Sequence, residues 1–271
     1  MENHRFLRHS LLAAGAISTI ALAGCGANTG TDSSSSASES TSTSSTSVEV
    51  FAAASLNAAG ADLEKAYEEA NPGVDVTFNF AGSSKLVQQM EQGATPDILI
   101  TADQKTMDSA QKTVEDLKDA QTQVIATNRL VLVSAEGNPA NISSVKDLSA
   151  DSVTTAICAV EVPCGNLAHQ ELKKQDVELG NATEEKNVTD VSTKVSSGAV
   201  DAGFIYSTDA ASIKKSQDVS VIDLPDLESN VYPMAVTKNG SENSAASDFA
   251  SWLESDEAQK ILANYDFGAA Q

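Results

Sequence analysis

The stretch Val48-Glu-Val-Phe-Ala-Ala-Ala-Ser-Leu-Asn-Ala-Ala-Gly60 joins a short apolar run to a helical pattern with almost no loop between them. Residues 48–54 are typical of a strand buried on both faces, and apolar residues from Leu56 onward recur at helical spacing. Ser55 stands at the junction, where a helix-capping residue belongs. A strand that opens directly onto a helix presents free N–H groups and a positive dipole end, which favour an anion. Ser55 is therefore either an anion ligand or only the cap of its own helix.

The alternation of strand and helix continues along the chain. Strands are expected over residues 74–80, 97–101, 129–134, 153–157, 202–206, 219–224 and 231–237. Helices are expected between most of them, including residues 104–120 and 166–174, and two more over 242–265. This pattern predicts an α/β protein with mainly parallel sheets, whose ligands bind beyond the carboxyl ends of the strands. Serines after Gly82 and the Pro163-Cys164-Gly165 turn stand at two further strand-to-helix junctions of this kind.

The N-terminal segment has the features of an export signal. Residues 1–24 carry Arg5 and Arg8 before an apolar run that is too short to span a bilayer permanently. The run ends in Leu22-Ala23-Gly24-Cys25, which resembles the lipobox of bacterial lipoproteins, in which the cysteine becomes the lipidated first residue. An ordinary secretory signal with an incidental cysteine is the alternative. The Ser- and Thr-rich residues 25–47 are expected to form a flexible tether, which places the folded part outside the cell, lipid-anchored to the outer face of the membrane.

Length and charge limit the remaining possibilities. Residues 48–271 are numerous enough for one large domain or two lobes, and no other segment is apolar and long enough to cross a membrane. The net charge of −21 argues against a nucleic-acid partner, because phosphate binding needs clustered Lys and Arg. Such a charge also disfavours an anion site.

Few residues could support catalysis or hold a metal. His4 and His9 fall in the leader, which leaves His169, expected on a helix surface, and no Ser–His–Asp set is evident. With Cys25 assigned to the lipid, Cys158 and Cys164 remain, and two cysteines with one histidine do not make a zinc site. Outside the cytoplasm such a pair can form a disulfide, which would also prevent Cys164 from acting as a nucleophile.

Five motifs occur in a fixed order: Phe51-Ala-Ala-Ala-Ser-Leu56, Phe80-Ala-Gly-Ser-Ser-Lys-Leu86, Pro96-Asp-Ile-Leu-Ile-Thr-Ala-Asp-Gln104, Val162-Pro-Cys-Gly165 and Gly203-Phe-Ile-Tyr-Ser-Thr-Asp209. Together they resemble the molybdate-binding proteins of molybdate ABC importers, over the whole of residues 48–267. The resemblance implies a type II periplasmic-binding-protein fold, in which two α/β lobes, each a mainly parallel sheet flanked by helices, are joined by two crossover segments. The crossovers are expected near residues 127–129 and 229–231. Lobe 1 would comprise residues 48–127 and 231–271, and lobe 2 residues 128–230 with the crossovers.

The resemblance also implies an oxyanion site made of hydroxyls and backbone N–H groups, which falls on Ser55, Ser83, Cys164, Val188 and Tyr206. Cys164 departs from the alanine common in the family, although only its N–H is needed. Val188 rests on counting eighteen residues back from Tyr206, because the local sequence diverges. Ser84 is a possible neighbour of the site. Without the resemblance, the favoured interpretation of Tyr206 is a core tyrosine that ends a buried strand.

A site of this composition would offer hydrogen-bond donors alone. Neutral dipoles can hold a tetrahedral dianion without Lys or Arg, which reconciles an anion site with the acidic sequence. Molybdate and tungstate carry no proton near pH 7 and suit such a site, whereas phosphate carries a proton that would want an acceptor. Sulfate also offers only acceptors, so it would have to be rejected by size.

These observations predict a monomeric solute-binding lipoprotein that captures molybdate, and tungstate as well, and delivers it to an ABC permease. No cofactor, no direct metal ligand and no enzymatic activity are expected. Another oxyanion or an iron(III) cargo on the same fold is the alternative within transport. An iron site would show paired tyrosines, and Tyr67, Tyr232 and Tyr265 are not expected near the junctions. A hydrolase or transferase is the alternative from another class.

The cysteine pair gives a first testable prediction. If Cys158 and Cys164 are bridged in the native protein, reduction adds the mass of two hydrogens to the intact chain. Labelling of both thiols in the native, unreduced protein would contradict the bridge.

Overall fold

The computed structural model describes residues 45–270. The expected leader (1–24), the lipidation residue Cys25 and the tether up to residue 44 lie outside the described residues. The first strand begins at Thr46, so residues 46 and 47, which were assigned to the tether, belong to the folded part. Over residues 45–270, no helix combines the length and the apolar character that crossing a membrane requires.

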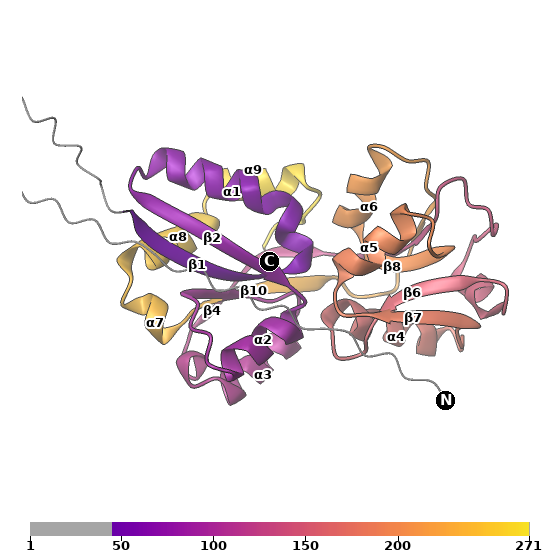
Figure 1. The fold of residues 1–271 in the computed structure, drawn as a ribbon, viewed down its shortest axis with the longest axis horizontal. Helices are drawn as coiled ribbons and strands as arrows, with labels where there is room; N and C mark the ends of the chain where they lie inside the picture. The colour runs from indigo at the N-terminus through magenta and orange to yellow at the C-terminus, as the bar shows by residue number, and fades with distance from the viewer. Residues whose placement is uncertain (1–44, 271) are drawn as a thin grey trace, which may run out of the picture. The chain divides into compact units, whose positions relative to one another are not determined.

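Lobe 1 is built on a five-stranded sheet with the order β2-β1-β3-β10-β4 (Figure 1). Its strands are β1 (Thr46–Ala53), β2 (Val74–Ala81), β3 (Ile98–Ile100), β4 (Thr122–Asn128) and β10 (Asn230–Val236). Strand β1 pairs in parallel with β2 and β3, whereas β10 runs antiparallel to its neighbours β3 and β4. Four of the five strands therefore share one direction.

Lobe 2 repeats this arrangement with the order β7-β6-β8-β5-β9. Its strands are β5 (Leu130–Ser134), β6 (Thr154–Cys158), β7 (Asn181–Glu185), β8 (Ala202–Tyr206) and β9 (Val221–Asp223). Here β5 is the antiparallel strand, between β8 and β9. The chain passes from β4 to β5 through Arg129 and returns from β9 to β10 through residues 224–229. The predicted two-lobed α/β fold is confirmed.

Helices cover both faces of each sheet. In lobe 1, α1 (Asn57–Ala70), α8 (Ser244–Leu253) and α9 (Asp256–Asn264) pack on one face, and α2 (Ser83–Glu91) and α3 (Gln104–Thr113) pack on the other. In lobe 2, α4 (Pro163–Lys174) lies on one side of the sheet, and α5 (Val188–Ser196) and α6 (Ser207–Lys214) lie on the other (Figure 1). A four-residue helix, α7 (Lys238–Ser241), follows β10.

The central position of β1 explains its composition. Val50 and Ala52 face the core under α1, α8 and α9, whereas Phe51 faces the core under α2 and α3. A strand between two helical layers has no solvent face, so alternate apolar and polar residues would bury polar side chains. The nearly continuous apolar run is the result.

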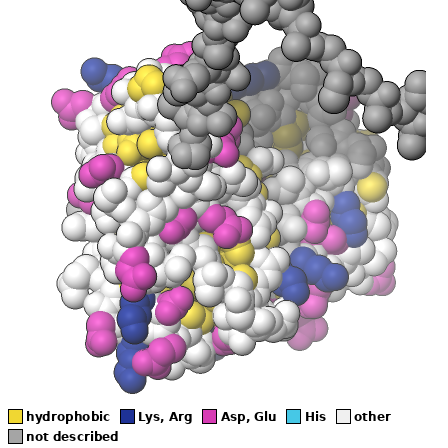
Figure 2. All heavy atoms as spheres, turned by 60° about the vertical axis from the view of Figure 1, so that its left-hand side comes forward, with side chains coloured by type: hydrophobic (Ala, Val, Ile, Leu, Met, Phe, Trp, Pro, Cys, Tyr) yellow, Lys and Arg dark blue, Asp and Glu magenta, His cyan; other side chains and the backbone are white. Residues whose placement is uncertain are grey.

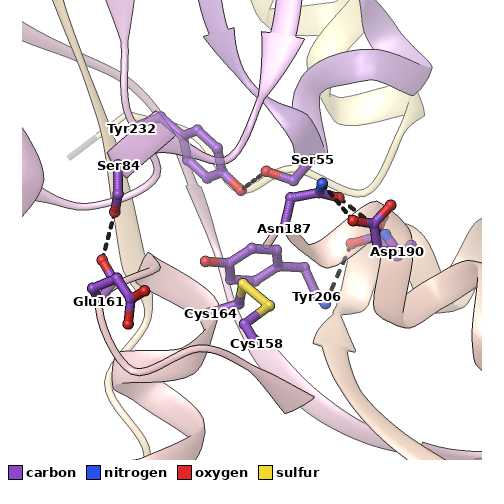
Figure 3. Close-up of a disulfide and its surroundings, with 10 residues drawn as sticks. Ser55, Ser84, Cys158, Glu161, Cys164, Asn187, Asp190, Tyr206 and Tyr232 are labelled. Atoms are coloured by element: carbon purple, nitrogen blue, oxygen red, sulfur yellow. Dashed lines mark hydrogen bonds between the residues drawn. A yellow bond between two sulfur atoms is a disulfide. The ribbon is translucent and has the colours of Figure 1, made fainter. Parts of the chain in front are cut away.

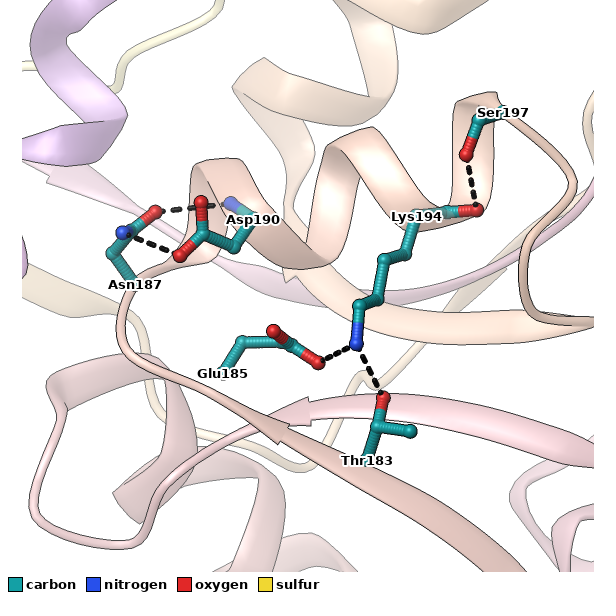
Figure 4. A network of polar contacts seen from close by, with 6 residues as sticks. All are labelled: Thr183, Glu185, Asn187, Asp190, Lys194 and Ser197. Atoms are coloured by element: carbon teal, nitrogen blue, oxygen red, sulfur yellow. Dashed lines mark hydrogen bonds and ion pairs between the residues drawn. The ribbon is translucent and has the colours of Figure 1, made fainter. Parts of the chain in front are cut away.

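Two details differ from the sequence-based expectation. The helix expected over 104–120 ends at Thr113, and a 3₁₀ turn, Glu115–Leu117, follows. Met107, Val114 and Leu117 have helical spacing, but Val114 adopts an extended backbone and all three still reach the same core. The mostly exposed edge strand β7 was missed because it carries no hydrophobic pattern. Lys194 of α5 forms an ion pair with Glu185 of β7 and donates a hydrogen bond to the Thr183 hydroxyl of the same strand (Figure 4).

The start of α4 is packed too closely for a side chain at Gly165. A Cβ atom there would lie 1.9 Å from the Ala159 carbonyl oxygen and 2.5 Å from that of Cys158. We therefore expect Gly165→Ala to lower the free energy of unfolding by about 1–3 kcal/mol, as overpacking does. Asn166→Ala, one position along the helix, is the control and should change it little. Chemical denaturation measures both, and equal stability of Gly165→Ala and wild type would contradict the packing described.

Candidate functional site

The five residues proposed from the sequence line one small cavity between the lobes. Its volume is about 10 Å³, and it is lined by Ala53, Ala54, Ser55, Gly82, Ser83, Ala102, Val162, Pro163, Cys164, Asn187, Val188 and Tyr206. This is smaller than the roughly 300–1,000 Å³ of a site for a drug-sized molecule. The cavity suits a small ion.

Helix starts from both lobes form much of the cavity wall. The N-cap residues of α2 and α4, Gly82 and Val162, make no side-chain capping hydrogen bond. Pro163, the first residue of α4, has no N–H, so Cys164 is the first residue of that helix with a backbone donor. Because the first N–H groups of a helix have no partner within it, these helix starts present donors and positive dipole ends to the cavity.

The start of α5 is capped in a way that spares its first donor. The Asn187 side chain accepts a hydrogen bond from the backbone N–H of Asp190 at 2.9 Å (Figure 4). The cap therefore serves the third residue of the helix, and the N–H of Val188 at the cavity wall lies outside it. Val188, the residue inferred by counting back from Tyr206, is the first residue of α5.

Ser83 is oriented by a neighbouring backbone group. Its hydroxyl oxygen accepts a hydrogen bond from the N–H of Ala102 at 3.0 Å, and the side chain is 1% exposed. A hydroxyl that accepts in this way keeps its own hydrogen to donate elsewhere. Ser83 is therefore arranged as a donor.

Ser55 does not cap its own helix, so that alternative is wrong. Strand β1 leads into a 3₁₀ turn, Ala54–Leu56, before α1 begins, and neither element has a side-chain cap. The Ser55 hydroxyl instead lies 2.7 Å from that of Tyr232 on β10 (Figure 3). No sequence pattern places Tyr232 near a junction; only the antiparallel return of β10 between β3 and β4 brings it there.

Tyr206 has a buried hydroxyl that forms no hydrogen bond with any described residue. The side chain is 1% exposed and ends β8 at the cavity wall, near the Ser55–Tyr232 pair (Figure 3). Burial, followed by the nearby Tyr232, raises the pKa of Tyr206 well above its usual value, so the hydroxyl stays protonated. An unpaired buried hydroxyl costs about 1–3 kcal/mol, which is expected where a ligand supplies the partner.

A disulfide fixes the loop that carries Cys164. Cys158, the last residue of β6, is bonded to Cys164 near the start of α4, with their Cα atoms 5.8 Å apart (Figure 3). The bridge restrains the backbone donor of Cys164 and leaves no thiolate there for nucleophilic chemistry.

Direct contacts between the lobes enclose the cavity. The Ser84 hydroxyl at the start of α2 donates to the carbonyl oxygen of Glu161 in lobe 2 (Figure 3). A Cβ atom on Gly82 would lie 2.3 Å from the carbonyl oxygen of Lys186, so only glycine allows this approach. Ser84 thus joins the lobes and does not line the cavity.

Among residues 45–270, no charged side chain lines the cavity. On the face shown in Figure 2, acidic side chains are scattered among fewer basic ones. Asp209, in the first turn of α6, accepts a hydrogen bond from the backbone N–H of Tyr206 at 3.3 Å, and burial raises the pKa of this carboxyl to about 7. His169 lies on α4 away from the cavity, and its Nε2 atom is buried rather than exposed as expected.

The chain is similar to known proteins both in sequence and in structure. Residues 48–268 match the family model described as bacterial extracellular solute-binding protein. The molybdate-binding protein ModA of Mycobacterium bovis is 38% identical over 215 residues, which cover 79% of this chain and 81% of that protein. The putative ABC transporter substrate-binding lipoprotein YvgL of Bacillus subtilis is 31% identical over 230 residues, which cover 81% of this chain and 85% of that protein. A solved structure, the substrate binding domain of a putative molybdenum ABC transporter from Clostridium difficile, is 30% identical with a TM-score of 0.60, covering 83% of this chain and 99% of that one.

Removing the Tyr206 hydroxyl tests whether this tyrosine only packs in the core or binds a ligand. Tyr206→Phe removes a buried group without a partner, so in anion-free buffer we expect it to raise the free energy of unfolding by about 1 kcal/mol. Tyr265→Phe is the control, because the Tyr265 hydroxyl donates to Asp62 at 2.7 Å on the surface. Destabilisation by Tyr206→Phe, measured by urea denaturation, would mean that its hydroxyl has a structural partner.

Proposed function

Because the chain belongs to the bacterial extracellular solute-binding protein family, we propose that it captures molybdate in the cavity between its lobes and delivers it to the permease of an ABC importer. The relatives named for molybdate support this cargo, and they cover most of the chain. The site that we propose comprises the hydroxyls of Ser55, Ser83 and Tyr206 and the backbone N–H groups of Cys164 and Val188.

The donor-only character of the cavity carries the proposal. Ser83 has its acceptor side occupied by a backbone N–H, the Tyr206 hydroxyl is unpaired, and helix starts supply the remaining donors. An ion that accepts hydrogen bonds on every oxygen can satisfy all of these groups at once. Tungstate shares that property, and we propose that it binds as well.

The hydrogen-bond donors disfavour hydrogenphosphate, and the size of the cavity disfavours sulfate. Hydrogenphosphate carries a proton that would face donors without an acceptor, an arrangement that costs affinity. Sulfate has no such proton, so only its smaller size would exclude it, by leaving some donors out of hydrogen-bond reach in an enclosed cavity.

An iron(III) cargo remains the alternative, and the tyrosines bear on it. The rings of Tyr206 and Tyr232 lie 6.5 Å apart, so a tyrosine pair does exist near the cavity, contrary to the expectation from sequence. Burial raises the pKa of both, that of Tyr232 to about 12, which disfavours the phenolates that would bind iron. Among residues 45–270, no three His, Cys, Asp or Glu side chains are grouped to hold a metal ion. The geometry therefore favours an oxyanion.

We further propose that the protein is held at the outer face of the membrane by a lipid on Cys25, and that it works as a monomer without a cofactor. The lipobox-like sequence supports the anchor, and so does a relative described as a lipoprotein. Lobe contacts such as that between Ser84 and Glu161 fit a closed form, and we propose that closure about the crossovers traps the anion. We propose no enzymatic activity.

Isothermal titration tests the cargo. Residues 26–271, which lack the leader and the lipidated cysteine, are titrated with molybdate, tungstate, sulfate and phosphate at equal ionic strength. We expect one molybdate or tungstate per chain and no measurable heat from the other two. Tight binding of sulfate or phosphate instead would overturn the cargo but not the transport role, and silence from all four would overturn both.

The two serines provide a residue-level test. Ser55→Ala and Ser83→Ala should each weaken molybdate binding by about 1–3 kcal/mol, because each removes a hydrogen bond to a buried charge. Ser251→Ala, which removes an exposed hydroxyl on α8 of the same lobe, away from the cavity and from the contacts between the lobes, is the control. Unchanged affinity in both cavity variants would remove these residues from the site.

A further inference from the structure

The direction of the hydrogen bond between Ser55 and Tyr232 decides what Ser55 offers to the cavity. Either hydroxyl can be the donor at 2.7 Å. If Tyr232 donates, Ser55 keeps its hydrogen for a ligand; if Ser55 donates, only its lone pairs face the cavity. Neighbouring groups that can act in one way alone settle the choice.

Asn128, at the end of β4 beside the first crossover, is fixed by such a group. Its Oδ1 accepts from the backbone N–H of Arg129 at 2.9 Å, and a backbone N–H can only donate. The other end of the amide is therefore the nitrogen. That nitrogen lies 3.2 Å from the Tyr232 hydroxyl and 3.0 Å from the hydroxyl of Thr208, so one hydrogen is available for each.

Tyr232 consequently receives a hydrogen bond from Asn128. Burial raises the pKa of Tyr232 to about 12, so its own hydrogen is present. That hydrogen is directed to the nearby Ser55 oxygen, because the other neighbours of the Tyr232 hydroxyl, the side-chain nitrogens of Asn128 and Asn230, donate and have no lone pair to accept it. Asn128, Tyr232 and Ser55 are all at most 4% exposed, so water does not compete for these groups.

We propose that Tyr232 is a positioning residue that holds Ser55 as a hydrogen-bond donor, and thereby keeps the cavity selective for anions without a proton. The chain of donation runs from the Asn128 amide to Tyr232, from Tyr232 to Ser55, and from Ser55 to the anion. Tyr232 itself does not line the cavity. This inference rests on the proposed function and adds to it the origin of the discrimination against hydrogenphosphate.

A double-mutant cycle tests whether Tyr232 acts through Ser55. Tyr232→Phe keeps the ring that packs against Phe267, with centroids 5.4 Å apart, and removes only the hydroxyl. We expect it to raise the molybdate Kd about 5- to 30-fold in the chain with Ser55. In the Ser55→Ala background the same change should alter the Kd by less than about twofold. An equal effect in both backgrounds, or none in either, overturns the proposal.

Selectivity gives a readout that a purely structural role would not change. Without Tyr232 as its donor, Ser55 is free to accept, so the ratio of the hydrogenphosphate Kd to the molybdate Kd at pH 8 should fall by about fivefold or more. Asn128→Ala, which removes the first donor of the chain, should shift the ratio in the same direction. Tyr67→Phe, a buried tyrosine of lobe 1 outside this chain of hydrogen bonds, is the control. A ratio unchanged in both test variants overturns the proposal.

These measurements distinguish failure of the proposed function from failure of the role proposed for Tyr232. If wild-type protein binds sulfate rather than molybdate, the cargo is wrong, and the same cycle run with sulfate still tests the chain of donation. Binding of none of these anions overturns both, because no ligand would then receive the Ser55 hydrogen.

Discussion

The convergence of backbone N–H groups at helix starts is the constraint on which the rest of the structure depends. A doubly charged anion can be held without a positive side chain only if neutral dipoles point at it from several sides. The starts of α2, α4 and α5 meet at one cavity because each follows a strand end on the facing edges of the two sheets. The acidic composition of the protein is compatible with anion binding for this reason.

The antiparallel strands β5 and β10 connect the fold to the site. Each occupies the fourth place in its sheet, and the two crossovers lead into them. Asn128 and Asn230 pair in register where β4 leaves the first lobe and β10 enters it, and Tyr232 follows Asn230 two residues later. The hinge region and the hydrogen bond to Ser55 are therefore parts of one buried polar network. Closure of the lobes and orientation of a cavity hydroxyl can depend on the same residues.

Much of this could be predicted from the sequence, and the reasons for the exceptions are physical. Ser55, Ser83 and Cys164 stand at strand-to-helix junctions, which local patterns reveal. A family motif pointed to Tyr206, and Val188 was inferred only by counting eighteen residues back from it. Tyr232 could not be found in this way, because its contact with Ser55 spans 177 positions and depends on which strands pair. The break at Val114 was missed because the apolar spacing continues through it, and β7 because its exposed edge has no pattern.

A crystal structure with molybdate, with anomalous diffraction measured at the molybdenum absorption edge, tests most directly whether neutral donors hold the anion. We predict one anomalous peak in the cavity, with the anion's oxygens about 2.7–3.1 Å from the hydroxyls of Ser55, Ser83 and Tyr206 and from the N–H groups of Cys164 and Val188. A peak elsewhere, or a Lys or Arg side chain contacting the anion, would contradict it.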